Sequence, residues 1–356
     1  MTRIDSLKKA AFSKSESNGY LIFNNTNLLY FLGFPGASSL LIPSEGESIV
    51  FVYGVNFEQA KAQSQGVNVE LIRGGENLTS KITAQVKDYK ITKLLVDALG
   101  VESWNALVKQ FPSEEMPEVN SSFVQALRAV KDKEEIELMR EAGELTSEGM
   151  KVACETVKPG AKEYEVAAEI EYAMRKRGAG PTAFETIVAS GACSAFPHGG
   201  CSGREIREGD LVVVDIGATL NYYCSDMTRT LVAGKPSEKQ HKIYDIVKTA
   251  QKNAFKSIKA GALVADVDAS ARKVIEEAGY GDYFVHRLGH GVGLEVHEPP
   301  SLNPVSKDAL VAGNVVTDEP GIYLPGFGGV RIEDTVLVQK DGGAKFTIGP
   351  YSLNGE

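Results

Sequence analysis

The chain of 356 residues has few cysteines and no long apolar segment. Four scattered cysteines are too few for a disulfide scaffold, so we expect reduced thiols and a cytoplasmic protein. No apolar run approaches the roughly 18 residues that a membrane-spanning helix requires. The first residues also lack the apolar core of a signal peptide. The sequence therefore predicts neither membrane insertion nor export.

An excess of positive charge is also absent. Asp and Glu number 47 and Lys and Arg 38, so the formal net charge is -9. The negative charge is spread along the chain, which argues against nucleic acid or an anionic membrane as a partner. Apolar residues make up 43% and charged residues 24% of the chain, ordinary values for a globular protein. This length suits two domains.

Residues 1–120 alternate short apolar runs with helical patterns, which predicts an α/β domain with a mixed or parallel sheet. The segment contains no Gly-rich phosphate loop and no cluster of titratable residues, so we expect a structural or dimerising role. A Pro-containing break at 111–117 separates it from a second domain, placed at 121–356. Expected strands are 20–23, 39–42, 48–53, 67–72 and 93–96, and expected helices are 57–65, 79–89 and 102–110.

The second domain contains an internal repeat. A short pattern that ends in Gly160 recurs at Gly261, and in both copies a helix follows that runs to a Gly eighteen residues further on, Gly178 or Gly279. Each copy then continues through a strand to a His and a hairpin. Several matches at nearly fixed offsets indicate duplication rather than chance. The two helix-plus-hairpin halves are expected at 140–235 and 240–340.

Each half ends in a hairpin with two carboxylates. An apolar strand leads to the first carboxylate, Asp215 or Glu319, which lies six residues after a Gly. A turn-rich segment leads to the second, Asp226 or Glu333. Two residues later both copies have a Thr, at positions 228 and 335. The two hairpins are therefore one motif written twice, with a longer loop in the second copy.

If the halves pack about a pseudo-two-fold axis, the four hairpin carboxylates converge. Carboxylates that lie close together raise one another's pKa, and bound divalent cations relieve this repulsion. His290 adds an imidazole, and its neighbours Gly289 and Gly291 allow close approach of the backbone. Such a ligand set predicts a two-metal site that favours Mn²⁺, Fe²⁺ or Co²⁺, with Zn²⁺ also possible.

Two further histidines have matching positions in the repeat. The symmetry places His198 and His297 on opposite sides of the metals, where each could donate to a substrate carbonyl oxygen or handle a proton. A water between the two metals would be the nucleophile. This arrangement predicts hydrolysis of a peptide or a similar amide bond.

The roles of three other side chains stay open in the sequence. Arg331, two residues before Glu333, could pair with a ligand carboxylate or bind the carboxylate of a substrate. Tyr323 could line the site or serve only in packing. His286 could support a metal ligand or be an ordinary strand residue.

The motifs together resemble the pita-bread metallopeptidases, which include methionine aminopeptidase, aminopeptidase P and prolidase. Asp215 and Asp226 are followed by HRLGHGVGLEVHE, DEPGIY and RIEDT. The stretch SGACSAFPHGG and the preceding small domain resemble the Xaa-Pro branch, and the length is most similar to the short prokaryotic prolidases. The resemblance implies an α/β N-terminal domain followed by a pita-bread domain of two related halves.

This resemblance implies a role for each metal ligand. Asp215 would bind one metal, while His290 and Glu319 would bind the other. Asp226 and Glu333 would bridge the two. The family implies dependence on cobalt or manganese, and often a homodimer in which the N-terminal domain borders the partner's site.

The resemblance also implies how a substrate is held. His198 and His297 would contact it and stabilise the tetrahedral intermediate. Arg331 would help to anchor it, and Glu319 would handle the proton of the attacking water. An Xaa-Pro bond is a tertiary amide without an N–H, which ordinary peptidases cleave poorly.

The leading hypothesis is thus a dinuclear-metal Xaa-Pro dipeptidase. An aminopeptidase P-type enzyme shares these motifs but accepts longer peptides. A metal-free amidinohydrolase of the creatinase type is disfavoured, because those relatives lack the full ligand set. A non-catalytic scaffold would have lost ligands or gained a basic patch, and the sequence has neither feature.

Overall fold

The computed structural model describes residues 2–112 and 115–355, and the chain divides into two compact units, Met1–Arg128 and Ala129–Glu356. The division falls at the last residue of helix α6 (Ser122–Ala129), whereas the sequence places the boundary before this helix, at residue 120. Val124 on α6 packs into the apolar core of the first unit, which explains the difference. The Pro-containing break includes residues 113 and 114, which lie outside the described residues. None of the described helices is long and apolar enough to cross a membrane.

The first unit is built on a six-stranded mixed sheet with the order β4-β3-β2-β1-β5-β6. Strand β1 pairs antiparallel with β2 and parallel with β5, so of the mixed or parallel sheet expected from the sequence the mixed form is observed. All five expected strands are present, and β6 is an addition at the edge. The strands are β1 (Gly19–Ile22), β2 (Ser39–Pro43), β3 (Ile49–Tyr53), β4 (Asn68–Ile72), β5 (Leu94–Val96) and β6 (Glu118–Val119).

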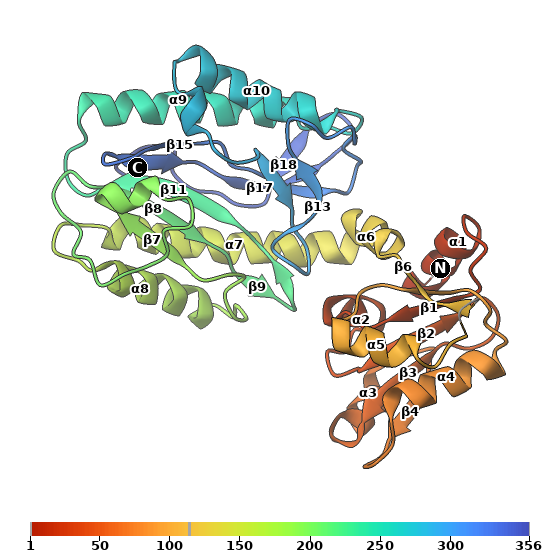
Figure 1. The fold of residues 1–356 in the computed structure, drawn as a ribbon. Helices are drawn as coiled ribbons and strands as arrows, with labels where there is room; N and C mark the ends of the chain where they lie inside the picture. The colour runs from red at the N-terminus through yellow and green to blue at the C-terminus, as the bar shows by residue number, and fades with distance from the viewer. Residues whose placement is uncertain (1, 113–114, 356) are drawn as a thin grey trace. The chain divides into compact units, whose positions relative to one another are not determined.

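Helices cover both faces of this sheet (Figure 1). Alternate residues of β1 point to opposite sides: Tyr20 packs with α1, α2 and α3, while Leu21 packs with α4 and α5. The sequence missed α1 and α2, although the side chains of Thr2 and Asn24 cap them. The helices are α1 (Arg3–Phe12), α2 (Asn25–Leu32), α3 (Phe57–Gln63), α4 (Leu78–Asp88) and α5 (Val101–Val108).

The second unit has helices on two sides of its strands (Figure 1). Helices α7 and α8 bury Met150 and Ile170 against the strands of the first half. Helices α9 and α10 bury Val247 and Val267 against those of the second half. Each half therefore has its own apolar cluster. The helices are α7 (Lys133–Thr156), α8 (Glu163–Lys176), α9 (Glu238–Ser257) and α10 (Val264–Glu277).

The strands of the two halves repeat one pattern. In the first half β8 lies antiparallel between β7 and β11, and in the second half β14 lies antiparallel between β12 and β17. A small hairpin, β9–β10 or β15–β16, follows the central strand. The strands are β7 (Ile187–Ser190), β8 (Leu211–Ile216), β9 (Thr219–Leu220), β10 (Tyr223–Cys224), β11 (Met227–Val232), β12 (Gly289–Gly291), β13 (Glu298–Leu302), β14 (Val315–Asp318), β15 (Gly321–Leu324), β16 (Gly328–Arg331), β17 (Asp334–Val338) and β18 (Gly343–Lys345).

Glycines with left-handed backbone conformation occur at matching turns of both halves. Gly adopts this conformation without the steric cost that a side chain would bring. Its presence at matching positions therefore marks turns that both copies share. This backbone agreement confirms the duplication predicted from the sequence. The pairs are Gly160 and Gly261 (φ 90° and 84°), Gly178 and Gly279 (104° and 84°), and Gly209 and Gly313 (80° and 95°).

Candidate metal centre

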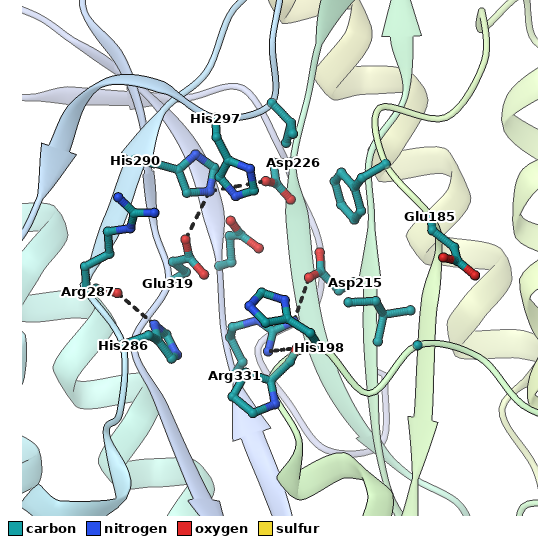
Figure 2. Close-up of a pocket in the computed structure, with 16 residues that line it drawn as sticks. Glu185, His198, Asp215, Asp226, His286, Arg287, His290, His297, Glu319 and Arg331 are labelled. Atoms are coloured by element: carbon teal, nitrogen blue, oxygen red, sulfur yellow. Dashed lines mark hydrogen bonds and ion pairs between the residues drawn. The ribbon is translucent and has the colours of Figure 1, made fainter. Parts of the chain in front are cut away.

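The four hairpin carboxylates lie on or next to the paired strands β8 and β11 of the first half and β14 and β17 of the second. Asp215 is on β8, and Asp226 immediately precedes β11. Glu319 follows β14, and Glu333 lies between β16 and β17. All four line one cavity of about 370 Å³ together with His290 (Figure 2). The packing of the halves therefore brings the five predicted metal ligands to one place.

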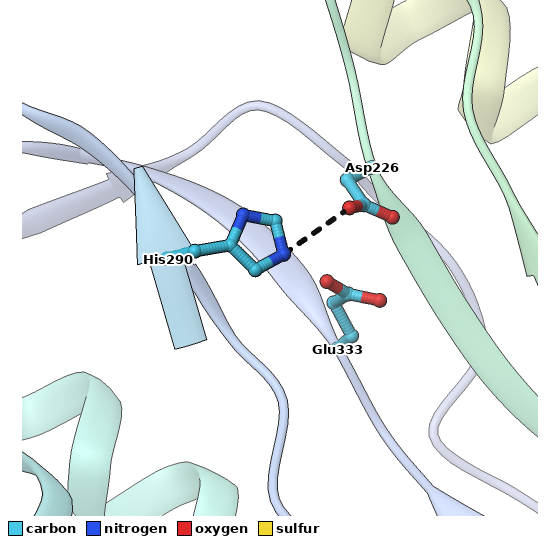
Figure 3. Close-up of side chains that lie close together, drawn as sticks. All are labelled: Asp226, His290 and Glu333. Atoms are coloured by element: carbon cyan, nitrogen blue, oxygen red, sulfur yellow. Dashed lines mark ion pairs between the residues drawn. The ribbon is translucent and has the colours of Figure 1, made fainter. Parts of the chain in front are cut away.

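Three of these side chains form the tightest group (Figure 3). Asp226, His290 and Glu333 each offer one ligand atom, and these atoms lie within 4.8 Å of one another. The Nε2 atom of His290 is 3.7 Å from Asp226 Oδ2 and 3.2 Å from Glu319 Oε1. All three residues of the group are buried, so water screens the repulsion between their charges only weakly.

Buried carboxylate oxygens without partners mark the centre. Within the described part of the chain, Asp215 Oδ1, Asp226 Oδ1 and Glu333 Oε1 are buried and accept no hydrogen bond. Burial and the neighbouring carboxylates raise the pKa of Asp226 and of Glu333 well above the ordinary value. A divalent cation would satisfy these oxygens and remove the repulsion. The residues present therefore fit divalent metal ions.

Glu319 and His290 form a preorganised pair. Burial alone would raise the pKa of Glu319, but the hydrogen bond and positive charge of His290 lower it to about 2. Burial likewise disfavours protonated His290, yet Glu319 outweighs this effect and raises the pKa of the imidazole. Thr317 Oγ1 joins the pair, because it accepts from the His290 backbone N–H at 3.0 Å and donates to Glu319 at 3.1 Å. A metal bound to this imidazole would displace its proton.

The guanidinium of Arg331 is buried in the cavity wall and already has protein partners. Its Nη2 donates to Asp215 Oδ2 at 2.6 Å, its Nη1 to the Tyr323 hydroxyl at 2.9 Å and its Nε to Thr228 at 3.0 Å. Of the two roles that the sequence left open, the structure shows contact with the carboxylate of Asp215, a predicted ligand. Tyr323 is buried, and its hydroxyl lies 2.9 Å from His286 Nε2. Tyr323 thus connects Arg331 to His286.

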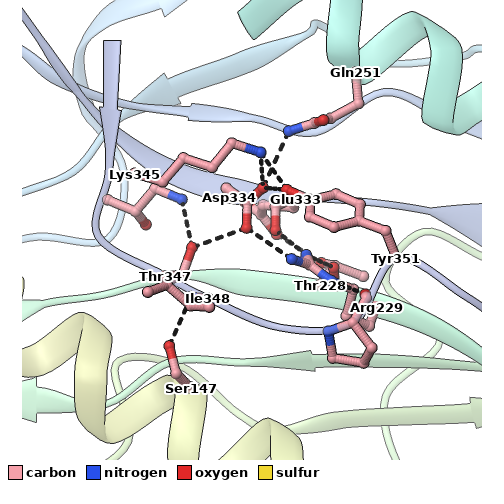
Figure 4. Close-up of polar contacts among 12 residues, drawn as sticks. Ser147, Thr228, Arg229, Gln251, Glu333, Asp334, Lys345, Thr347, Ile348 and Tyr351 are labelled. Carbon is pink, nitrogen blue, oxygen red and sulfur yellow. Dashed lines mark hydrogen bonds and ion pairs between the residues drawn. The ribbon is translucent and has the colours of Figure 1, made fainter. Parts of the chain in front are cut away.

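The threonines at matching positions link each half to the other. Thr228 Oγ1 donates to Glu333 Oε2 at 2.6 Å, and Thr335 Oγ1 donates to the Asp226 carbonyl at 2.7 Å. The neighbouring Arg229 donates to the Glu333 carbonyl at 2.6 Å and forms a buried ion pair with Asp334 (Figure 4). These bonds hold the carboxylate of Glu333 and the backbone of Asp226 at the contact between the halves.

His198 and His297 both line the cavity and are exposed. Figure 2 shows His297 next to His290 on one side of the carboxylates and His198 next to Arg331 on the other. The rings of His297 and His290 have their centroids 4.2 Å apart. The partial burial of its ring and then the neighbouring charge of His290 lower the pKa of His297 below the ordinary value.

Two family models cover the chain. The Creatinase/Prolidase N-terminal domain matches residues 3–130, and the model of metallopeptidase family M24 matches residues 137–340. The chain belongs to metallopeptidase family M24. The resemblance to the pita-bread metallopeptidases, drawn from the motifs, is thereby confirmed in both parts of the chain.

Relatives of this M24 protein extend over nearly its whole length. The Xaa-Pro dipeptidase of Pyrococcus furiosus is 42% identical over 328 residues, which cover 90% of each chain. The structure of an Xaa-Pro dipeptidase from Bacillus anthracis matches with a TM-score of 0.93 and 38% identity, and covers 98% of both chains. An X-Pro aminopeptidase from Thermotoga maritima has a TM-score of 0.87 and 35% identity, over 96% of this chain and 98% of the other.

Other residues of the M24 cavity were not singled out in the sequence. Phe184 and Glu185 line it just before β7, Ile187 lines it at the start of that strand, and Arg287 and Val296 line it near the histidines. The sequence around the beginning of a strand does not show which of its residues face a cavity. Arg287 could have been noticed, because it lies inside the motif between His286 and His290.

Proposed function

We propose that this M24 metallopeptidase hydrolyses Xaa-Pro dipeptides with the help of two divalent metal ions. The observation that carries the proposal is the convergence of five carboxylate and imidazole side chains, with unpartnered buried oxygens, in one cavity. The Xaa-Pro dipeptidases among the relatives supply the substrate class. The cavity volume is also in the range expected for small-molecule sites.

In this proposal the five predicted ligands have different roles in metal binding and proton transfer. Asp215 would hold one ion, His290 and Glu319 would hold the other, and Asp226 and Glu333 would be ligands of both. When bound, the ions supply Lewis-acid polarisation and lower the pKa of a bound water. Glu319 accepts the proton of the attacking water and passes it to the proline nitrogen as the bond breaks.

Hydrogen-bond donors on both sides of the carboxylates complete the proposed site. His198 and His297 donate to the substrate carbonyl oxygen as negative charge develops on it. Arg331 and Tyr323 orient Asp215 from behind. For Arg331 to anchor the substrate carboxylate, as the sequence predicts, it would have to exchange one of its present partners.

The remaining parts of the proposal concern the metals and the assembly. Carboxylate-rich ligation favours Mn²⁺ or Co²⁺, with Fe²⁺ or Zn²⁺ as further candidates. The free thiols of Cys154, Cys193 and Cys201 suit a reducing cytoplasm. A homodimer follows from the family resemblance, and light scattering of the purified protein tests it.

Removal of one residue from longer Xaa-Pro peptides is the second candidate. The X-Pro aminopeptidase of Thermotoga maritima supports it through its close structural match. The two activities differ in whether the site accepts peptide beyond the proline. A dipeptidase must instead close around the free carboxylate of its substrate.

Hydrolysis of Met-Pro and Met-Pro-Gly separates the two candidates. The protein is treated with chelator, refilled with Mn²⁺ or Co²⁺ and assayed with each peptide. Cleavage of Met-Pro alone is the expected result. Comparable cleavage of Met-Pro-Gly would favour the aminopeptidase, and no cleavage of either by the metal-loaded protein would overturn both.

A further inference from the structure

Glu163, the first residue of α8, is a buried carboxylate outside the metal centre. Its Oε1 accepts from the backbone N–H and the hydroxyl of Ser190, at 2.8 and 2.6 Å. Its Oε2 accepts from the same two groups of Ser202, at 2.9 and 2.5 Å. One carboxylate therefore receives four hydrogen bonds from two points of the chain.

These two points are the ends of the loop that carries His198. Ser190 is the last residue of β7, and the chain returns to Glu163 at Ser202. Charge-assisted hydrogen bonds of this kind are stronger than neutral ones, and the helix N-terminus also favours a negative charge here. We call Glu163 with its bonds to Ser190 and Ser202 the clamp. The clamp fixes the distance between the two ends of the loop, residues 191–201.

The loop is anchored to the second half from its other side. Ser194 Oγ accepts from the Gly329 backbone N–H at 2.9 Å. The Pro197 carbonyl, next to His198, accepts from Arg331 at 3.4 Å. A change in the loop ends would thus be transmitted to the residue that precedes His198.

The second half uses the same device at another histidine. Asp268 and Arg272 on α10 form an ion pair at 2.7 Å. Asp268 accepts from the Leu288 N–H at 3.0 Å, and Arg272 donates to the His286 carbonyl at 2.9 Å. In each half, an acidic residue of the second helix holds a loop with a histidine that lines the cavity.

We infer that Glu163 is a positioning residue, which sets the place of His198 relative to the substrate through the ends of its loop. The inference rests on the proposed function, because it assigns a catalytic contact to His198. The hydrogen bonds themselves are independent of that function, so the clamp and the catalytic role are tested separately.

The activity test compares Glu163→Gln with Glu169→Gln, which changes an exposed acid further along the same helix. In Glu163→Gln, an NH₂ group replaces one of the two carboxylate oxygens. This NH₂ group is a donor that faces the N–H donor of one Ser, so that end of the loop loses its acceptor. We expect kcat for Met-Pro to fall by up to about 100-fold with metal content unchanged, and Glu169→Gln to behave as the wild type. Ser202→Ala removes one donor and is expected to give a smaller loss.

A double-mutant cycle separates positioning from general damage. In a His198→Ala background, Glu163→Gln is expected to change kcat little, because the residue through which it acts is already absent. An additive loss, or a large loss of bound metal, would overturn the inference. An unchanged kcat in Glu163→Gln would do the same.

Amide hydrogen exchange tests the clamp without any assay of activity. Glu163→Gln is expected to speed exchange in residues 190–202 and not in 284–290, while Asp268→Asn does the reverse. Equal exchange of 190–202 in wild type and Glu163→Gln overturns the clamp. If the wild type cleaves no Xaa-Pro dipeptide, the proposed function fails, and the exchange result still decides whether Glu163 holds the loop.

Discussion

Asp226, a proposed metal ligand, lowers the stability of the metal-free protein. One of its oxygens has no partner among the described residues, and burial together with three neighbouring carboxylates raises its pKa. An unsatisfied buried polar group costs about 1–3 kcal/mol. The same oxygen is well suited to a cation, so the cost is recovered only when metal is bound.

We therefore expect Asp226→Asn to stabilise the metal-free protein and to abolish activity. The amide removes one negative charge and supplies a donor for its neighbours, for a gain of about 1 kcal/mol. Thermal unfolding with and without Mn²⁺ measures both effects, and the variant should lose the metal-induced rise in melting temperature. Glu141→Gln, at an exposed position, is the control. A less stable metal-free Asp226→Asn protein would contradict this account of the centre.

His286 makes the stability depend on pH. Burial lowers its pKa below the ordinary value of 6.5, so the unfolded chain binds the proton first. The stabilisation from neutral His286 is complete above pH 6.5 and is lost as the pH falls below that value. The ring donates through Nδ1 to the Arg287 carbonyl and accepts at Nε2 from Tyr323, which requires the neutral form.

In metal-free protein, the stability advantage of the wild type over His286→Gln should shrink between pH 8 and pH 5.5. Melting temperatures of both proteins across this range measure the difference. His241 is exposed, so the melting temperature of His241→Gln should change with pH in the same way as that of the wild type. A constant offset between wild type and His286→Gln would show that His286 is not held neutral.

At the scale of elements, the β9–β10 hairpin contains a conformational cost. Its turn residues Asn221 and Tyr222 both have positive φ, 45° and 74°. Such turns suit the twist of a hairpin, and Asn tolerates this conformation, but a bulky side chain does not. Tyr222 is half exposed, so little packing compensates for the strain.

Tyr222→Gly should stabilise the protein by about 1 kcal/mol, because Gly adopts positive φ without steric cost. Chemical denaturation measures the change in the free energy of unfolding. Tyr222→Phe keeps the strained backbone and should show no gain. A loss of stability in Tyr222→Gly would indicate that the exposed ring makes contacts that outweigh the strain.

The five strands and the helices α3, α4 and α5 of the first unit could be predicted from the sequence, and α1 and α2 were missed. Five strands of the first unit were expected within one or two residues. The signal that could have shown α1 and α2 is the capping side chain before each helix, Thr2 and Asn24, which was not noticed. The boundary at 120 was placed before α6, since only tertiary packing shows to which core Val124 belongs.

At the scale of the whole molecule, each unit has cores of its own. All residues of the cavity belong to the second unit. A fragment of residues 129–356 should therefore fold cooperatively and bind Mn²⁺ by itself. Circular dichroism and calorimetric titration check this, with His290→Ala in the same fragment as the control. An aggregated fragment, or one without metal binding, would contradict the independence of the unit.

The amino-acid sequence by itself determined the class of site. The repeat supplies two hairpins with paired carboxylates, and ligand types and offsets can be counted along the chain. It also determined the duplicated turns, because Gly is the residue that accepts a left-handed backbone. Both are local properties, which depend on residues near one another in the chain.

The tertiary structure decided which groups pair. Arg331 faces Asp215, Thr228 and Thr335 reach across to the opposite half, and Glu163 closes the loop of His198. These partners are far apart in the chain, so no sequence spacing links them. Their pairing follows from the burial of charged and polar groups, each of which must find a partner because water is excluded.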